Sequence, residues 1–417
     1  MPRVAIVGGC RTPFVRAGGV FSKYSFLDLG VHVTQALVRR LKLDPSSIEE
    51  FIFSTVLLDP RAPNFAREII LRSGLPLSIP AHAVSNNCIS GLVSLNMLAE
   101  AIRAGRIKVG VGGGAESMSR PTLTLKPKAE AFFLALSRAR SLGERLKILA
   151  SYRLGFVLPV APSPKEPSTG LSMGQHCELT AQEFGIEREL QDRIALRSHK
   201  NAARAQESGI LTEEIEPFAG VAKDNLIRSD SSIERLAALK PVFDRSPKGT
   251  LTAGNSSSLT DGASLVCLMA EDEARKQRRE ILGFLEACEY SAIAPADGLL
   301  MAPALALPKL LQRQGLSLAS IDLFEIHEAF AAQVETNLRA WEKGWSKCPQ
   351  ITPIGRVPEE KINVNGGSIA IGHPFAATGG RLLLSAVQQL KRSGKKTAVI
   401  SVCAAGAMAC AMLVRRD

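Results

Sequence analysis

The chain has 417 residues, with 46% hydrophobic and 22% charged side chains, which excludes a disordered protein and predicts two or three domains. Its net charge of +11 favours anionic partners such as lipid headgroups or a phosphorylated ligand. Few aromatic residues and no zinc-finger spacing leave no nucleic-acid signature, and eight cysteines without a Cys-x-x-Cys pair support neither a disulfide scaffold nor structural zinc.

The first 120 residues alternate apolar strands with amphipathic helices. The strands are predicted at 4–7, 51–53, 81–84 and 109–114, and the helices at 28–41 and 91–104. A strand–helix–strand order of this kind predicts parallel strand pairs in a helix-covered sheet. Because the first residues have the pattern of a buried strand rather than of a secretory leader, we expect a cytoplasmic protein.

Residues 121–249 interrupt this rhythm with prolines and then with charged helical segments. Residues 129–158 form an amphipathic stretch whose apolar side chains can share one broad helical face, with basic residues in excess. Such a helix can lie on an anionic membrane as a peripheral contact, dock on a partner subunit, or cover the protein's own active-site entrance. It is too charged to span a membrane.

The α/β pattern returns after residue 249. A helix at 379–390 and a strand at 397–402 stand between glycine-rich loops, a layout like that of the first part. We therefore expect two duplicated halves. The predicted domains are an N-terminal domain from 1–120 with 250–284, an inserted loop domain at 121–249, and a C-terminal domain at 285–417.

Two residues at predicted strand-to-helix junctions are candidates for chemistry. Cys88 stands where a helix dipole and free N–H groups would lower its pKa, and it is either a nucleophile or a small buried core residue. His373 lies between Gly372 and Pro374 and is either a general base for a thiol or a cap of the following helix.

Three further segments have both a functional and a plain interpretation. Cys403 ends an apolar strand beside small residues and is either a proton shuttle or a core residue. His327-Glu328 opens a helix, where it either holds a substrate oxygen or caps the helix; it is no zinc motif, because Ala331 stands where a second histidine would be needed. The small polar loop 250–263 is suited to contact a thin ligand arm, or is a surface turn.

Taken together, these segments resemble the thiolase family. The motifs lie at 85–92, 113–119, 172–174, 252–263, 327–330, 365–379 and 403–406, and so cover the whole chain. Within the family the chain is most similar to the β-subunit of the fatty-acid β-oxidation trifunctional complex and its bacterial counterparts. It has His-Glu-Ala-Phe where most thiolases have Asn-Glu-Ala-Phe, a terminal Cys-Ala-Ala-Gly, and a long insertion after Pro121.

The resemblance implies a thiolase fold of two α-β-α domains, each with a mixed five-stranded sheet. It implies thiolysis of 3-ketoacyl-CoA by CoA, with Cys88 acylated, His373 as base and Cys403 as the acid that protonates the acetyl-CoA enolate. His327 would bind the thioester oxygen directly or through a water, and the backbone N–H groups of Cys88 and Ala405 would bind the oxyanion. The implied substrate and CoA contacts are Met173, Ala253, Ser257, Ala329 and Phe330.

Assembly and alternatives follow from the same resemblance. CoA is a substrate, and we expect no metal or redox cofactor. The implied partners are further copies of the chain, in a dimer or tetramer, and an α-subunit with hydratase and dehydrogenase activities. The alternatives are a short-chain acetyl-CoA acetyltransferase acting on acetoacetyl-CoA, a decarboxylating ketoacyl synthase, and a non-catalytic acyl-CoA-binding scaffold. The scaffold hypothesis rests on Ala407 and Ala409, which stand where the family usually has glycine.

Overall fold

The computed structural model describes residues 2–163 and 165–417. Its strands form a continuous sheet in the order β4-β3-β5-β6-β1-β7-β10-β9-β8, with the short β2 paired to β6. The strands are β1 (Val4–Arg11), β2 (Val15–Arg16), β3 (Glu50–Ser54), β4 (Ala81–Val84), β5 (Val109–Ser117), β6 (Thr260–Ala270), β7 (Gly283–Ala292), β8 (Leu323–Ile326), β9 (Thr397–Ala404) and β10 (Met408–Arg415).

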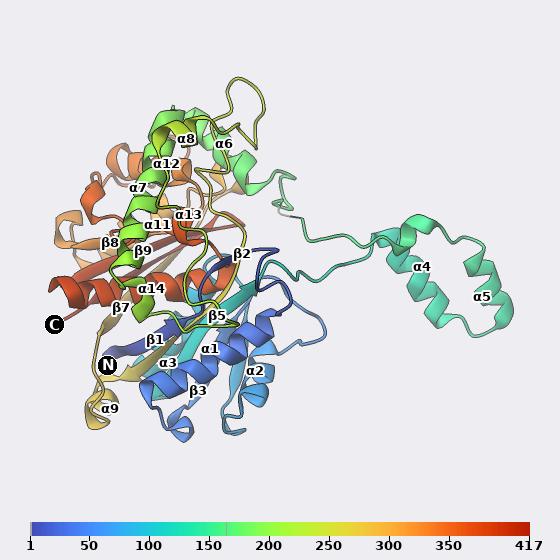
Figure 1. Cartoon of the computed structure of the whole chain (residues 1–417), viewed down its shortest axis with the longest axis horizontal. Helices are drawn as coiled ribbons and strands as arrows, with labels where there is room; N and C mark the ends of the chain where they lie inside the picture. Colours follow the sequence, from blue (N-terminus) through green and yellow to red (C-terminus); the bar gives the residue numbers. More distant parts are fainter. Residues whose placement is uncertain (1, 164) are drawn as a thin grey trace.

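The helices cover this sheet and also build the inserted region (Figure 1). They are α1 (Phe26–Leu41), α2 (Phe65–Ser73), α3 (Ser90–Arg103), α4 (Pro127–Arg138), α5 (Leu142–Leu149), α6 (Met173–Glu183), α7 (Arg188–Glu207), α8 (Ile233–Ala237), α9 (Glu271–Lys276), α10 (Pro295–Gly298), α11 (Pro303–Gln314), α12 (Ala331–Lys343), α13 (Ser368–Ile371) and α14 (Phe375–Ser393).

Side chains that alternate between the two faces of the strands pack the molecule into five layers. These are α1 with α2, the first part of the sheet, α3 with α14, the second part of the sheet, and α11 with α12. In β1, Ala5 and Val7 pack with α1 and α2, whereas Val4 and Ile6 face α3 and α14. In β10, alternate residues face either α3 and α14 or the outer helices α11 and α12. Helices α3 and α14 therefore form a middle layer between the two parts of the sheet. The predicted α/β class with two α-β-α halves is confirmed.

The two parts of the sheet differ from the prediction in two respects. The first half-sheet (β4-β3-β5-β6-β1) has the expected five strands, but the second (β7-β10-β9-β8) has four within the described chain. The half-sheets are also joined, because β1 and β7 pair antiparallel through Val4–Ile6. Both parts mix parallel and antiparallel pairs, as the resemblance implied: β3 pairs parallel with β4 and β5, and β6 runs antiparallel to β5 and β1.

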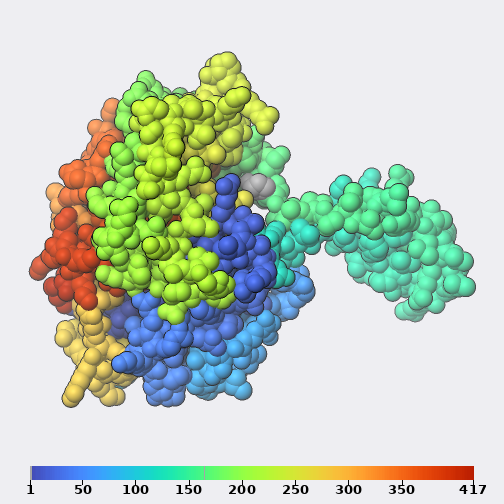
Figure 2. Space-filling view, in the orientation of Figure 1, coloured from blue at the N-terminus to red at the C-terminus, as the bar shows by residue number. Residues whose placement is uncertain are grey.

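The amphipathic stretch predicted at 129–158 is not one helix. It forms a projecting hairpin, residues 124–160, closed by paired backbone hydrogen bonds between Thr124 and Val160 and built from α4 and α5. Helix α4 ends at Arg138, and a new helix, α5, begins after Ser141, which forms a capping box with Glu144. The hairpin stands away from the rest of the molecule (Figure 2), so it does not cover the active-site entrance.

In the described part of the chain, no helix is both long and apolar enough to cross a membrane.

Candidate active site

The loop before α3 positions Cys88. Asn87 adopts a left-handed conformation with a φ of 48°, which asparagine tolerates better than most residues. Ser90 ties the loop together: its Oγ accepts a hydrogen bond from Asn86 N–H at 2.7 Å and donates one to Asn87 O at 2.6 Å. The side-chain Nδ2 of Asn87 donates to Ala405 O at 3.0 Å. The Cys88 loop is thereby fixed to the turn that follows Cys403.

Close contact between α3 and α14 brings the Cys88 and His373 loops together. A Cβ added at Gly91 would lie 2.4 Å from the carbonyl oxygen of Ala376, and one at Gly379 would lie 2.8 Å from the backbone nitrogen of Leu92. Only glycine permits such close backbone approach. The starts of the two middle-layer helices, one from each half of the chain, are therefore in direct contact.

Two buried imidazoles lie against each other in the site. His327 follows β8. Its backbone N–H donates to Ser401 O at 2.8 Å, and its ring Nδ1 lies 2.8 Å from Ser368 Oγ. The backbone N–H of His373 donates to Thr260 Oγ1 at 3.1 Å, and its ring Nδ1 lies 2.7 Å from Thr378 Oγ1. The ring centroids are 4.0 Å apart. Neither Nε2 atom has a hydrogen-bond partner among the described residues, although both are buried.

The second thiol belongs to the same site. Cys403 is near the end of β9 and packs in an apolar cluster with Cys177, Phe330 and Ala407. Burial raises the pKa of Cys403 well above its usual range, and the neighbouring Cys88 raises it further. The structure therefore places Cys88 beside Cys403 and His327 beside His373. The contact between the starts of α3 and α14 joins the Cys88 loop to the His373 loop.

The electrostatics of Cys88 differ from the prediction. Burial raises the pKa of Cys88 to about 12, because desolvation of the thiolate outweighs the N–H groups of Ala405 and Cys88 that favour it. Burial, and then the charge of Arg381, lower the pKa of His373 to about 3. The prediction that the helix start lowers the pKa of Cys88 is therefore wrong. At neutral pH the resting site holds a neutral thiol and a neutral imidazole.

The predicted substrate contacts fall into two neighbouring places. Met173, Ala329 and Phe330 belong to the apolar cluster around Cys403. Ser257 N–H donates to Ala329 O at 2.9 Å, which fixes the 250–263 loop beside that cluster. Ala253 instead lines a cavity of about 520 Å³. Its other lining residues include His199, Arg228, Arg235, Ser258 and Ile369.

Two buried carboxylates near the site, Glu116 and Glu328, make contacts that the sequence does not predict. Glu116 accepts hydrogen bonds from Thr55 Oγ1 and from Val56 and Leu57 N–H, and burial raises its pKa to about 7. Glu328 accepts from Ser198 Oγ at 2.6 Å and Asn363 Nδ2 at 2.6 Å, so it holds the loop before α13. The motif around Glu116 gave a signal, but no role was assigned to it.

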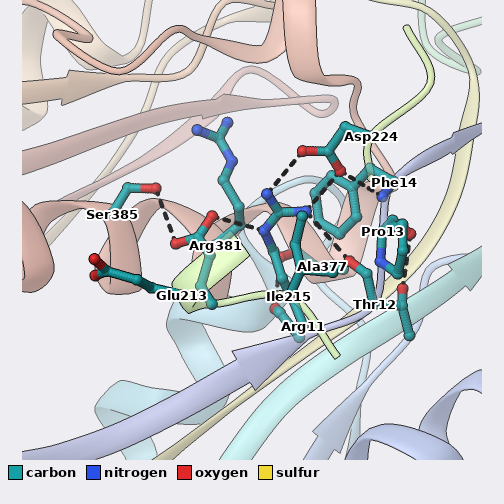
Figure 3. A network of polar contacts seen from close by, with 12 residues as sticks. Arg11, Thr12, Pro13, Phe14, Glu213, Ile215, Asp224, Ala377, Arg381 and Ser385 are labelled. Atoms are coloured by element: carbon teal, nitrogen blue, oxygen red, sulfur yellow. Dashed lines mark hydrogen bonds and ion pairs between the residues drawn. The ribbon is translucent and has the colours of Figure 1, made fainter. Parts of the chain in front are cut away.

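Arg381 was missed altogether. An arginine within a helix has the pattern of an exposed residue, yet Arg381 is 0% exposed. It lies beside the buried ion pairs of Arg11 with Asp224 and Glu214 (Figure 3). Its Nη2 donates to Ser368 Oγ at 3.0 Å, the same hydroxyl that contacts His327.

Ala407 lies in the turn that follows Cys403, with its side chain buried. Its φ is 53°, a left-handed conformation that costs a residue with a Cβ about 1 kcal/mol. The residue is buried with Cys403 and Cys177, and its carbonyl oxygen accepts from Ile293 N–H at 3.0 Å. The turn at Gly406 is further held by Glu166, whose Oε2 accepts Gly406 N–H at 3.0 Å.

Comparisons with known proteins agree along the whole chain. The model of the thiolase N-terminal domain matches residues 4–272, and that of the thiolase C-terminal domain matches residues 279–416. A 3-ketoacyl-CoA thiolase of Pseudoalteromonas translucida is 42% identical, over 99% of this chain and 96% of that protein. One of Photobacterium profundum is 40% identical, over 100% of this chain and 97% of that protein.

The fold agrees as well. The crystal structure of the Bacillus anthracis acetyl-CoA acetyltransferase superposes with a TM-score of 0.83 at 29% identity, covering 100% of this chain and 99% of that one. The predicted thiolase fold is thereby confirmed. With both domain models matched in order and full-length relatives at this identity, the chain belongs to the thiolase family.

Proposed function

We propose that the chain catalyses the thiolysis of 3-ketoacyl-CoA by CoA in fatty-acid β-oxidation, giving acetyl-CoA and a shortened acyl-CoA, and the reverse Claisen condensation. The observation that carries this proposal is a pair of neighbouring thiols, Cys88 and Cys403, with Cys88 at a helix start that contacts the one beside His373. The neutral imidazole of His373 lies against that of His327. The names of the full-length relatives support the same reaction.

The first step is attack by Cys88 on the 3-keto carbon. His373 Nε2 takes the thiol proton, while its Nδ1–H donates to Thr378 Oγ1. With the pKa of Cys88 raised to about 12 and that of His373 lowered to about 3, a resting thiolate–imidazolium pair is unfavourable. Proton transfer therefore accompanies attack on the substrate rather than preceding it.

Cleavage of the bond between C2 and C3 of the substrate then leaves negative charge on the acetyl-CoA enolate, which the site must stabilise. The acetyl-CoA enolate leaves with its thioester oxygen held by His327 and His373, and Cys403 protonates its carbon. The N–H groups of Cys88 and Ala405, which lie against the Cys88 thiol, bind the oxyanion of the acyl transfer. Loss of one such donor typically costs about 10²–10³-fold in rate. The Cys403 thiolate then deprotonates CoA, and the CoA thiolate takes the acyl group from Cys88. The leaving Cys88 thiolate regains the proton held by His373.

The cavity lined by Ala253 and Arg228 is the proposed CoA site. Arg228 forms no ion pair with any described residue, whereas Arg235 pairs with Asp230, so Arg228 is the better cation for a CoA phosphate. The cavity borders the catalytic loops through Ser258 and Ile369. We place it in the loop domain, residues 121–249, between an N-terminal domain (1–120 and 250–284) and a C-terminal domain (285–417).

Acyl-enzyme trapping tests the reaction. After incubation with a 3-ketoacyl-CoA, the acyl mass should be found on the Cys88 peptide, and Cys88→Ala should not turn over. Cys88→Ser should be nearly inactive, because a hydroxyl is far less acidic than a thiol. Cys403→Ala should still be acylated from an acyl donor but should not exchange deuterium into acetyl-CoA. Turnover by Cys88→Ala, or exchange by Cys403→Ala at the normal rate, would contradict these roles.

The runner-up activity is acetyl transfer to acetyl-CoA, which the name of the Bacillus anthracis structure describes for that protein. Turnover measured across 3-ketoacyl-CoAs of increasing chain length separates the two. Activity confined to acetoacetyl-CoA would favour the short-chain enzyme.

The projecting hairpin supports a second proposal, a peripheral contact with an anionic membrane. Residues 124–160 contain seven basic residues and two acidic ones. Large apolar side chains on the same hairpin are exposed, with Leu142 at 74% and Leu154 at 81%. Phe132 is buried against Tyr152 and Phe156, so the hairpin has a small core of its own while its leucines face outward. Exposed leucines beside arginines match an anionic lipid surface.

A third proposal concerns assembly. Among the described residues β4 pairs with β3 alone, so its other edge is open except at Ala81, whose carbonyl oxygen accepts from Asn64 Nδ2 at 3.1 Å. This edge comes directly before the Cys88 loop. An open strand edge is a template for pairing with another chain. We place a homodimer contact at this edge. The α-subunit with hydratase and dehydrogenase activities remains a proposal carried by the resemblance.

A further inference from the structure

Arg381 is a buried cation whose carboxylate neighbours are engaged elsewhere. Asp224 and Glu214 accept hydrogen bonds from Arg11 at 2.7–2.8 Å. The nearest carboxylate oxygen to Arg381 is that of Glu325, 3.9 Å from Nη1, which is too far for a hydrogen bond. Among the described residues, Nε and Nη1 have no hydrogen-bond partner. Within the described part of the chain, the one hydrogen bond of this guanidinium goes to Ser368 Oγ.

The Arg381 hydrogen bond and the burial of Ser368 together set the direction of the Ser368 proton. An arginine can only donate, so Ser368 Oγ is the acceptor at 3.0 Å. The hydroxyl is fully buried and its one proton needs an acceptor, and within the described chain the contact that can accept it is His327 Nδ1 at 2.8 Å. Ser368 therefore donates to Nδ1. In a neutral imidazole whose Nδ1 accepts, the proton is on Nε2.

The imidazole is neutral for independent reasons. His327 is buried, and His373 and Arg381 stand close by, all of which lower the pKa of His327 well below its usual range. Its Nε2 is buried without a partner beside the His373 ring. An Nε2–H at this place is an unpartnered hydrogen-bond donor beside His373, whereas the other tautomer would present a lone pair and repel an oxyanion.

We propose that Arg381, acting through Ser368, is a positioning residue that fixes His327 in the tautomer carrying its proton on Nε2. The use of that N–H, binding the thioester oxygen, rests on the proposed thiolase reaction. The tautomer itself does not, and can be measured without substrate.

The first experiment measures the tautomer by ¹⁵N NMR of protein labelled at its six histidines. His327→Asn identifies the His327 signals by their loss. In the unaltered protein, Nδ1 should have the shift of an unprotonated nitrogen and Nε2 that of a protonated one. In Arg381→Leu and in Ser368→Ala the two nitrogens should move toward averaged shifts, and Arg381→Lys should restore the original pattern in part. A protonated Nδ1 in the unaltered protein would overturn the proposal.

The second experiment separates positioning from a merely structural role. An asparagine at 327 offers an amide N–H without any tautomer to fix. Arg381→Leu should therefore lower kcat about 10–100-fold when residue 327 is histidine, with little change in KM, but only about twofold in the His327→Asn background. Equal losses in both backgrounds would overturn the proposal. If the unaltered protein shows no thiolysis at all, the proposed function fails while the NMR result still decides the tautomer.

Discussion

At the scale of single residues, burial makes the site histidines neutral and so makes stability depend on pH. In the folded chain the pKa of His373 is about 3 and that of His327 is also lowered, whereas in the unfolded chain both titrate near their ordinary value of about 6.5. Below that value the unfolded chain binds more protons. The stability contributed by these residues is therefore present above about pH 6.5 and is lost as the pH falls toward the folded pKa.

His327→Asn should weaken this dependence by removing one of the two groups. Well below about pH 6.5, the free energy of unfolding of the unaltered protein should fall more steeply than that of the variant, by about 1 kcal/mol per pH unit. Urea unfolding at fixed protein concentration, at about pH 6 and about pH 5, measures both slopes. The opposite effects of Glu116 and Glu325, whose pKa values burial raises to about 7 and about 8, are present in both proteins and cancel. Parallel slopes would show that His327 is not a buried neutral group.

The sequence predicts the catalytic residues better than their surroundings. Cys88, His373, Cys403 and His327 each lie in a short local motif, so they can be found without knowing the fold. Ser368 lies within the motif at 365–379, but nothing local marks its contact with His327, and nothing local marks Arg381 at all. Both contacts depend on how α13 and α14 pack in the folded chain. The raised pKa of Cys88 was missed for the same reason, since burial is a property of the folded chain.

At the scale of elements, the hairpin shows that a hydrophobic pattern predicts amphipathic character but not where one helix ends and the next begins. Its apolar and basic residues predicted an amphipathic segment correctly, but the pattern alone joined α4 and α5 into one helix. The serine–glutamate capping box at Ser141 and Glu144 was the available sign of a new helix start.

Charge reversal on this hairpin tests its membrane contact. The unaltered protein should pellet with anionic vesicles at low salt, and replacing Arg138, Arg140 and Arg145 by glutamate should abolish pelleting. All three side chains are exposed and far from Cys88, so turnover of a short 3-ketoacyl-CoA should persist.

A matched control changes the same charge elsewhere. Lys200, Lys223 and Lys395 are exposed on the body of the molecule, and their replacement by glutamate should leave most of the pelleting intact. Equal loss in both variants would mean that net charge rather than the hairpin binds the vesicles. Failure of the unaltered protein to pellet would refute the membrane contact.

At the scale of the whole molecule, the duplicated layout of the sequence predicts the two α-β-α halves, because strand and helix periodicity repeat in each. Their joining through β1 and β7 was not predictable, since strand pairing between halves leaves no local pattern. The open edge of β4 was not predictable either, because it also depends on which strands pair in the folded chain.

Blocking that edge should dissociate the proposed dimer. The carbonyl groups of Pro80 and Val84 accept from β3, so by alternation Ala83 N–H points to the open side. Ala83→Pro removes this donor while leaving the β3 hydrogen bonds in place. Sedimentation velocity should show a dimer or larger species for the unaltered protein and a shift toward monomer for the variant, with circular dichroism as the folding control. A fully active monomer of the unaltered protein would contradict the interface.

The middle layer has a consequence for how the chain folds. Helix α3 comes from the first half and α14 from the second, yet each completes the apolar core of both half-sheets, and they touch through bare backbone at Gly91 and Gly379. Neither half retains a closed core when the other is lost, so partial unfolding exposes apolar surface on the half that remains. Cooperativity between the halves follows, and a folding intermediate containing only the N-terminal strands would be prone to aggregate until α14 is synthesised and docks.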